Sequence, residues 1–379
     1  MRPRLVLVAT GAAAAIAAAA LARGAAGAAV ANAWPPFALV LGLLLVGAVA
    51  AEDGVFLRLA ALLDRLPGGE WALYGGSMAL VAVVTAVLNL DTAVAFLTPV
   101  LVHTARRREA GEQRLLYGCV FMANAASLLL PGSNLTNLLV LSGEHVSGSV
   151  FLARMALPWV ASVLVTAIGV AVLVRGGSPA LGRTTKQPEA PAQAAVATAR
   201  PRLGAAGIAA ITVLTLAVAD PALPILGTGL LLVSIRALRS RLPLPTLTRS
   251  IDLPTLAGVF LAALSLGTLA RVWSFPATMM ARAGIAATAT AAAVTAILVN
   301  NLPAAVLLGS ATPPHPRALL IGLDIGPNLA VTGSLSAVIW WQAARVAGAR
   351  PSALRYSLTG IVLVPLTIAA ALAAGRAVI

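Results

Sequence analysis

Charged residues are scarce in this sequence: they form 10% of its 379 residues, and only 12 of them are acidic. With a single cysteine, Cys119, one chain can build neither a disulfide framework nor a thiolate metal site. No Walker-type loop, zinc-binding helix motif or nucleophile elbow occurs at a credible place. The sequence therefore predicts that the protein is not an enzyme and needs no cofactor, so that energy comes from an ion gradient, the membrane potential or a separate subunit.

Basic residues give a net charge of +14, but this excess does not indicate nucleic acid. The arginines fall in the joints between apolar runs and form no stripe interleaved with aromatic residues. Such a distribution is typical of residues that orient a membrane protein. We therefore exclude nucleic acid as a partner.

Hydrophobic residues make up 60% of the chain, and the mean hydropathy is +0.95. Soluble domains contain about 45–50% apolar residues, and a membrane-spanning helix needs about 20 in succession. The sequence therefore predicts an all-α, multi-pass protein of the inner (cytoplasmic) membrane. The predicted spans are 5–22, 36–51, 114–145, 155–174, 203–219, 222–238, 253–270, 317–343 and 355–375. Trp340 and Trp341 are expected at a membrane–water interface.

Two further apolar runs, 71–104 and 283–311, are interrupted by polar residues at Asn89-Leu90-Asp91-Thr92 and at Asn300-Asn301-Leu302-Pro303. We interpret both as re-entrant helical hairpins, which makes about nine full spans plus two hairpins. This arrangement places most arginines, including the Arg106–Arg108 cluster, on the cytoplasmic side, as the positive-inside rule requires. The N-terminus is then cytoplasmic, and the two hairpins open to opposite sides.

The two halves of the chain show weak internal similarity. A shift of about 200 positions lays Asn124 on Asp324 and Thr136 on Ser336, as in transporters with inverted repeats. We therefore predict a first transmembrane repeat at 1–175, a cytoplasmic linker at 176–202 and a second repeat at 203–379.

Each predicted hairpin is followed by a span with a second polar break, and irregular backbone at membrane depth survives only where it lines a cavity or is buried in protein. The candidate substrate-binding residues at these four breaks are Asn89, Thr92, Ser133, Asn134, Thr136, Asn137, Asn300, Asn301, Asn328, Gly333 and Ser334. Asp91 and Asp324 are the candidates for proton or ion coupling, because intramembrane carboxylates usually face a polar cavity. Helix caps and polar contacts between helices are the alternative roles.

At these breaks the sequence resembles the arsenite efflux permeases, the membrane subunits of arsenical pumps, within the wider ion transporter superfamily. The segments that carry the resemblance are Leu90-Asp91-Thr92 through Leu97-Thr98-Pro99, Ala126-Ser127-Leu128, Ser133-Asn134-Leu135, Asn137, Asn300-Asn301-Leu302-Pro303, Ile321-Gly322, Asp324, Gly326-Pro327 and Gly333-Ser334-Leu335. Four positions depart from that pattern. Leu90 and Thr92 replace the Asn and Gly beside the aspartate, Asn124 stands where these permeases can carry an Asp, and Asn328 replaces a Lys.

The resemblance implies proton-coupled efflux of arsenite or antimonite, small inorganic solutes, with Asp91 carrying the proton. A homodimer and a soluble ATPase subunit are the protein partners that it suggests, and the lipid bilayer surrounds the chain. The main alternative is a sodium-coupled transporter of carboxylates or other anions. A sodium/proton antiporter and a membrane scaffold without transport are the other readings; the clustered polar breaks argue against the scaffold.

Overall fold

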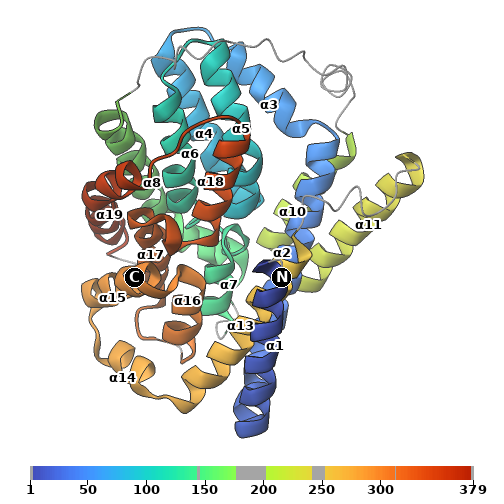
Figure 1. The fold of residues 1–379 in the computed structure, drawn as a ribbon, viewed down its shortest axis with the longest axis vertical. Helices are drawn as coiled ribbons and strands as arrows, with labels where there is room; N and C mark the ends of the chain where they lie inside the picture. Colours follow the sequence, from blue (N-terminus) through green and yellow to red (C-terminus); the bar gives the residue numbers. More distant parts are fainter. Residues whose placement is uncertain (1–2, 143–145, 176–201, 241–251, 312, 377–379) are drawn as a thin grey trace.

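The computed structural model describes residues 3–142, 146–175, 202–240, 252–311 and 313–376. Over these ranges the chain forms seventeen α-helices, three short 3₁₀ helices and no strand (Figure 1). The predicted all-α fold is therefore confirmed for the described part of the chain. The predicted linker, 176–202, lies outside it except for Arg202, the first residue of a helix.

The helices follow one another along the described ranges of the chain. Those before the predicted linker are α1 (Pro3–Leu21), α2 (Arg23–Glu52), α3 (Val55–Asp64), α4 (Glu70–Val87), α5 (Leu90–Arg107), α6 (Glu112–Ala126), η1 (Pro131–Ser133), α7 (Leu135–Leu141) and α8 (Gly148–Leu173). Those after it are α10 (Arg202–Ala217), α11 (Ala222–Ser240), α13 (Leu253–Val272), α14 (Phe275–Arg282), α15 (Ile285–Val299), α16 (Asn301–Gly309), α17 (Pro316–Ile325), η2 (Gly326–Leu329), η3 (Val331–Gly333), α18 (Leu335–Val346) and α19 (Ala353–Ala374).

Six helices of the described chain are long and apolar enough to cross a membrane: α2, α4, α8, α11, α13 and α19. Shorter apolar helices occur at Leu5–Leu21, Leu203–Ala217 and Ile285–Val299. Length and composition alone do not separate a full crossing from a hairpin arm, and α4 is one of the predicted arms. With six such helices, the protein is a polytopic membrane protein. The predicted number of spans and the two repeats stay predictions.

Three local expectations from the sequence are wrong. Helix α2 begins at Arg23, well before the predicted start of its span, and continues through Pro35 and Pro36. It packs along α10, α11 and α13, although each proline lacks the N–H that a helix interior uses. Helices α3 and α14 were not predicted, since each is short. Trp340, expected on the lipid-facing surface, is fully buried and donates its indole N–H to the Leu116 carbonyl at 2.9 Å, whereas Trp341 is partly exposed.

Close helix packing joins the two halves of the sequence. Helix α2 contacts α10, α11 and α13, and α8 contacts α19. A Cβ at Gly42 would lie 2.7 Å from the carbonyl group of Ile225, so only glycine lets α2 and α11 approach so closely. The halves interleave, and the proposed repeat boundaries remain a prediction.

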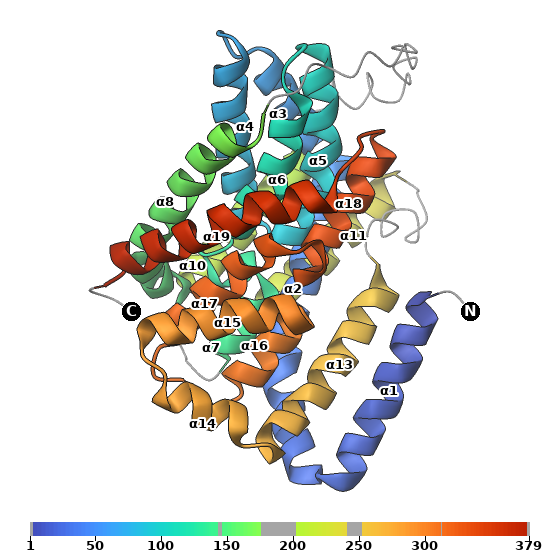
Figure 2. The same ribbon diagram turned by 60° about the vertical axis from the view of Figure 1, so that its left-hand side comes forward.

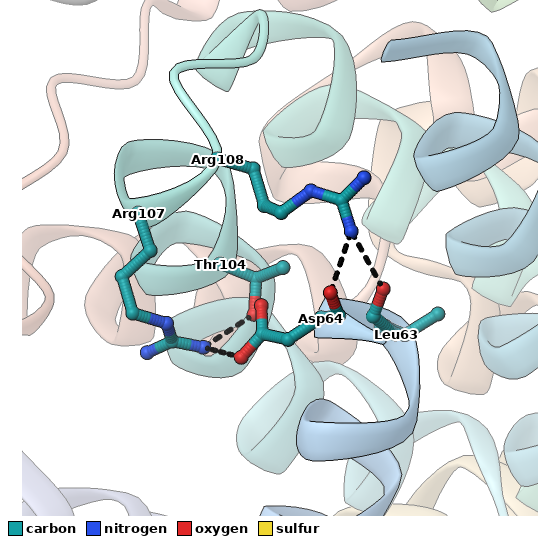
Figure 3. A network of polar contacts seen from close by, with 5 residues as sticks. All are labelled: Leu63, Asp64, Thr104, Arg107 and Arg108. Atoms are coloured by element: carbon teal, nitrogen blue, oxygen red, sulfur yellow. Dashed lines mark hydrogen bonds and ion pairs between the residues drawn. The ribbon is translucent and has the colours of Figure 1, made fainter. Parts of the chain in front are cut away.

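Helices α4 and α5 form a hairpin that returns to the side from which it started. The guanidinium of Arg108, which follows α5, donates to the carbonyls of Asp64 at 2.7 Å and of Gly68 at 2.9 Å, just before α4. Figure 3 shows the contact of Arg108 with the Asp64 carbonyl and the neighbouring one, in which Arg107 donates to the Asp64 carboxylate at 2.7 Å. The polar interruption at Asn89 therefore lies at the far end of the hairpin from the arginine cluster, Arg106–Arg108.

Helices α15 and α16 form the second pair, and they break at Asn300. This residue has φ +80° and ψ 150°, a region that side chains other than glycine rarely adopt and that costs about 1–3 kcal/mol. Helix α14, which leads into α15, also contacts α16, so the chain turns back at this break.

Candidate functional site

Four short or hairpin helices, α5, α7, α16 and α18, begin in the interior of the molecule. Helices α5 and α18 run side by side in the same direction: Ser336 donates to Asp91 at 2.6 Å near their starts. Arg106 donates to the Ala347 carbonyl at 2.8 Å near their ends. Helices α7 and α16 pack together in the other half of the molecule (Figures 1 and 2). The N-termini of both pairs therefore face the middle of the protein.

Each of the four helices is capped by a polar side chain that the sequence analysis selected. The oxygens of Asn89, Asn134, Asn300 and Ser334 accept hydrogen bonds from backbone N–H groups of Thr92, Thr136, Leu302 and Ala337, at 2.7, 3.2, 3.3 and 3.1 Å. Replacing such a cap by alanine costs about 0.5–2 kcal/mol. These four candidates therefore have a structural role whether or not they touch a substrate.

Asp324, at the end of α17, is enclosed by hydroxyl and amide donors from the first half of the chain. Its carboxylate accepts from Thr136 Oγ1 at 2.7 Å, Asn134 Nδ2 at 2.9 Å and Ser127 Oγ at 3.0 Å. The carboxylate is completely buried, and no basic side chain of the described residues pairs with it. We call this group, Asp324 with Ser127, Asn134 and Thr136, the Asp324 cage. Ser127 was not among the predicted site residues, although it lies within a segment that carries the family resemblance.

Ser133 and Asn137 support the Asp324 cage from behind. Both donate to the carbonyls of Ser127 and Leu130, which fixes the turn between α6 and α7. These two candidates therefore hold the backbone of the loop, and the side chain of Asn137 also lies close to the Asp324 carboxyl group.

Asn328 and Asn124 form a second buried contact beside the cage. Asn124 Nδ2 donates to Asn328 Oδ1 at 2.7 Å, and Asn328 Nδ2 donates to the Phe121 carbonyl at 3.3 Å. Both positions depart from the arsenite permease pattern, where Asp and Lys can occur. The two positions that depart from this pattern thus contact each other, and both carry a neutral amide side chain in this protein.

Asp91 lies in the first turn of α5, half-buried, and its partner is Ser336 in the first turn of α18. Ser336 was not predicted as a site residue. The internal shift that places Thr136 on Ser336 was the signal for it, because Thr136 makes the corresponding contact with Asp324. Each carboxylate thus receives a hydroxyl from the second residue of one of these helices.

The break at Asn300 is joined to the segment before α18. Asn300 Nδ2 donates to the Thr332 carbonyl at 3.0 Å, and Asn301 is buried at the first position of α16. A Cβ at Gly333 would lie 2.9 Å from Pro327 Cα, so glycine is needed there. We call these four residues, Asn300, Asn301, Gly333 and Ser334, the helix-start group.

Several buried polar atoms near the breaks have no hydrogen-bond partner within the described chain. They are Asn89 Nδ2, Thr92 Oγ1, Asn124 Oδ1 and Asn137 Oδ1. Buried polar groups are normally paired, so unpaired atoms at these positions are suited to contact with a polar solute. They offer both donors and acceptors.

The four helix starts differ in charge. An N-terminus carries about half a positive charge and attracts anions. Helix α5 has Asp91 in its first turn, whereas the first turns of α7, α16 and α18 contain no acidic residue. The side chains at the start of α7 bind Asp324. Ser336 at the start of α18 binds Asp91. Among these four helices, only α16 therefore begins without a carboxylate beside it.

Asp91 and Asp324 are not part of a cluster of acidic ligands. No group of three or more His, Cys, Asp or Glu side chains that could hold a metal ion occurs in the ranges that the structure covers. The carboxylates are thus separate sites: neutral hydroxyl and amide groups surround Asp324, and the Ser336 hydroxyl contacts Asp91.

A family described as citrate transporter matches residues 2–375, nearly the whole chain. A search of curated proteins finds no match.

Proposed function

Because the chain belongs to the citrate transporter family, we propose that it carries small carboxylate anions across the membrane, coupled to the movement of a cation. The protein is a membrane transporter, and the carboxylate alternative from the sequence analysis agrees better with this family than arsenite efflux does. The family match gives arsenite no support. The observation that carries the proposal is the start of α16, which has no carboxylate beside it and which Asn300 joins to the segment before α18.

The helix-start group provides the binding site for the anion in this proposal. Helix N-termini that end inside a membrane protein bind carboxylates through N–H donors and the positive end of the dipole. The bond from Asn300 to Thr332 ties the starts of α16 and α18 together, so one carboxylate-bearing solute contacts both. Asn301, buried at the first turn of α16, supplies an amide for a second carboxylate or hydroxyl oxygen.

The Asp324 cage and Asp91 provide the coupling sites. A buried carboxylate without a basic partner is costly at membrane depth, and a proton or monovalent cation removes that cost. Neutral hydroxyl and amide groups around Asp324 stabilise the carboxylate when it is empty and offer oxygen ligands when a cation is bound. Binding of the cation also lowers the repulsion between these carboxylates and an anionic substrate, which couples the two solutes.

Substrate counterflow in proteoliposomes tests this function. Proteoliposomes that contain the purified protein are loaded with unlabelled citrate. The entry of labelled citrate is then measured in the presence of succinate, acetate or arsenite as competitor. We expect competition by di- and tricarboxylates and none by arsenite. Counterflow of arsenite without counterflow of carboxylates would reverse the assignment.

A charge variant localises the anion. Asn301→Asp places a negative charge at the start of α16, so we expect the half-saturation concentration of the carboxylate to rise about tenfold, in line with 1.4 kcal/mol. Gln113→Glu makes the same chemical change at the start of α6, where Gln113 contacts Arg355, and serves as the matched control. Equal effects of the two variants would show that the charge acts through the whole protein and not at the helix-start group.

A further inference from the structure

A small pocket, lined mainly by Ala, Gly, Leu and Val, lies at the opposite ends of α7 and α16 from their N-termini. Its volume is about 30 Å³, and its walls come from α2, α7, α13 and α16 together with the residues that follow α7 and α16. The polar residues that line it are Asn32, Ser142, Arg271 and Ser310. We call it the Arg271 pocket. In Figures 1 and 2 the end of α13 that carries Arg271 leads into α14, at the opposite end of the molecule from α4.

Arg271 brings an uncompensated positive charge to this pocket. Its Nη1 donates to the Gly267 carbonyl of its own helix at 2.8 Å, and its Nη2 donates to the Ala28 carbonyl of α2 at 3.4 Å. Within the described ranges, no carboxylate pairs with this half-buried guanidinium. Arginine has five N–H donors in a planar fork that matches a carboxylate, so donors remain for a ligand. The side-chain amide of Asn32, which is exposed, adds another.

The pocket lies on a seam between two groups of helices. One wall is formed by α2 and α13, and the other by α7 and α16. Helix α16 begins at the helix-start group and ends at Gly309 in the pocket wall, and its nine residues span about 12 Å. A carboxylate in the pocket is therefore separated from the proposed anion site by the length of one short helix.

We propose that the Arg271 pocket is a peripheral binding site for the transported carboxylate on the face opposite the arginine cluster, the side that the positive-inside rule makes external. The inference rests on the proposed function. Arg271 draws the anion to the mouth of the seam, and Asn32 donates to the same carboxylate. Two surface tryptophans, Trp34 and Trp273, are 43% and 48% exposed near the same end. This places the pocket near a membrane–water interface, so a lipid phosphate is the competing ligand of the same charge.

The experiment is uptake of labelled citrate by proteoliposomes of known protein orientation, with the carboxylate supplied to one side at a time. Arg271→Gln is expected to raise KM about fivefold on the pocket side, with kcat unchanged, as for a partly exposed charge pair. KM from the other side stays unchanged. Arg271→Lys keeps the charge and retains most of the affinity. Arg282→Gln removes another arginine, exposed at the end of α14 and outside the pocket, and is the matched control.

Ionic strength gives a second readout that a purely structural role would not change. Because salt screens exposed charges, the wild-type KM on the pocket side rises with salt, whereas that of Arg271→Gln does not. If Arg271→Gln does not fold, Asn32→Ala, at an exposed position, replaces it. Its KM values from the two sides of the membrane are compared in the same way.

Three outcomes overturn the inference. A wild-type KM in Arg271→Gln, with transport of citrate intact, refutes the pocket alone and leaves the proposed function in place. An effect that appears in vesicles containing anionic phosphatidylglycerol and disappears in neutral phosphatidylcholine vesicles assigns the guanidinium to an anionic lipid headgroup. Absence of carboxylate transport by the wild type removes both the proposed function and this inference.

Discussion

Asp324→Asn is the substitution that tests ion coupling most specifically. The amide has the same shape as the carboxylate and carries no charge, so the Asp324 cage keeps its packing. Three neutral donors surround the carboxylate, and no basic side chain of the described chain compensates it. If Asp324 binds one coupling cation per cycle, the variant transports the anion with one cation fewer.

The size of the effect follows from thermodynamics. A tenfold cation gradient without a membrane potential contributes about 1.4 kcal/mol per cation. Loss of one cation therefore lowers the accumulation ratio of the carboxylate at equilibrium about tenfold under these conditions. A potential of 100 mV, negative inside, adds about 2.3 kcal/mol for each charge moved, so the difference between variant and wild type increases with the potential.

The assay is the zero-flux measurement in proteoliposomes. The cation gradient is fixed, the carboxylate gradient is varied, and the point at which net flux vanishes gives the stoichiometry. Asp53→Asn is the matched control, because Asp53 is also buried but accepts from the Gly204 N–H at 2.8 Å and lies 3.5 Å from Arg236. We expect this control to keep the wild-type stoichiometry. An Asp324→Asn protein with the wild-type zero-flux point would refute the assignment of a coupling ion to Asp324.

Two other substitutions test the packing around the site. Asn124→Asp leaves an unpaired buried charge, so we expect citrate counterflow to fall about tenfold or more. The side chains of Asn124 and Asn328 are 2.7 Å apart, so adding Asn328→Lys supplies an opposite charge beside the new carboxylate and should restore part of the counterflow. Gly333→Ala forces a Cβ against Pro327, so we expect the melting temperature in detergent to fall by several degrees. Gly227→Ala is the control: no atom lies within 4 Å of its Cβ, so it should not lower the melting temperature. Equal stability of the two variants would contradict the packing argument.

The sequence predicted where the helices break, because polar residues interrupt apolar runs that are too long for one span. Helix α5 begins at Leu90 and α16 at Asn301, within the two predicted interruptions. The short helix α3 was missed because it carries charged residues and has no long apolar run. The local sequence pattern thus predicts the helix breaks but does not predict the short connecting helices.

The partners of the two carboxylates required the structure. Asp324 binds Thr136 across 188 residues, and Asp91 binds Ser336 across 245, and no local pattern encodes such pairings. Of the two serines that the prediction missed, Ser127 is followed by three leucines, and Ser336 lies two residues after the predicted Ser334. Their contacts depend on how α17 packs beside α6 and how α18 packs beside α5. The functional roles of the predicted site residues remain predictions for the experiments above.

Concentrative uptake of citrate by the wild-type protein tests the central claim most directly. Purified protein in liposomes is given labelled citrate with an inward gradient of Na⁺, of protons, or of neither. We predict accumulation above the external concentration with at least one of the two gradients, and only equilibration without a gradient. Accumulation of arsenite, with citrate excluded under every gradient, would contradict the account.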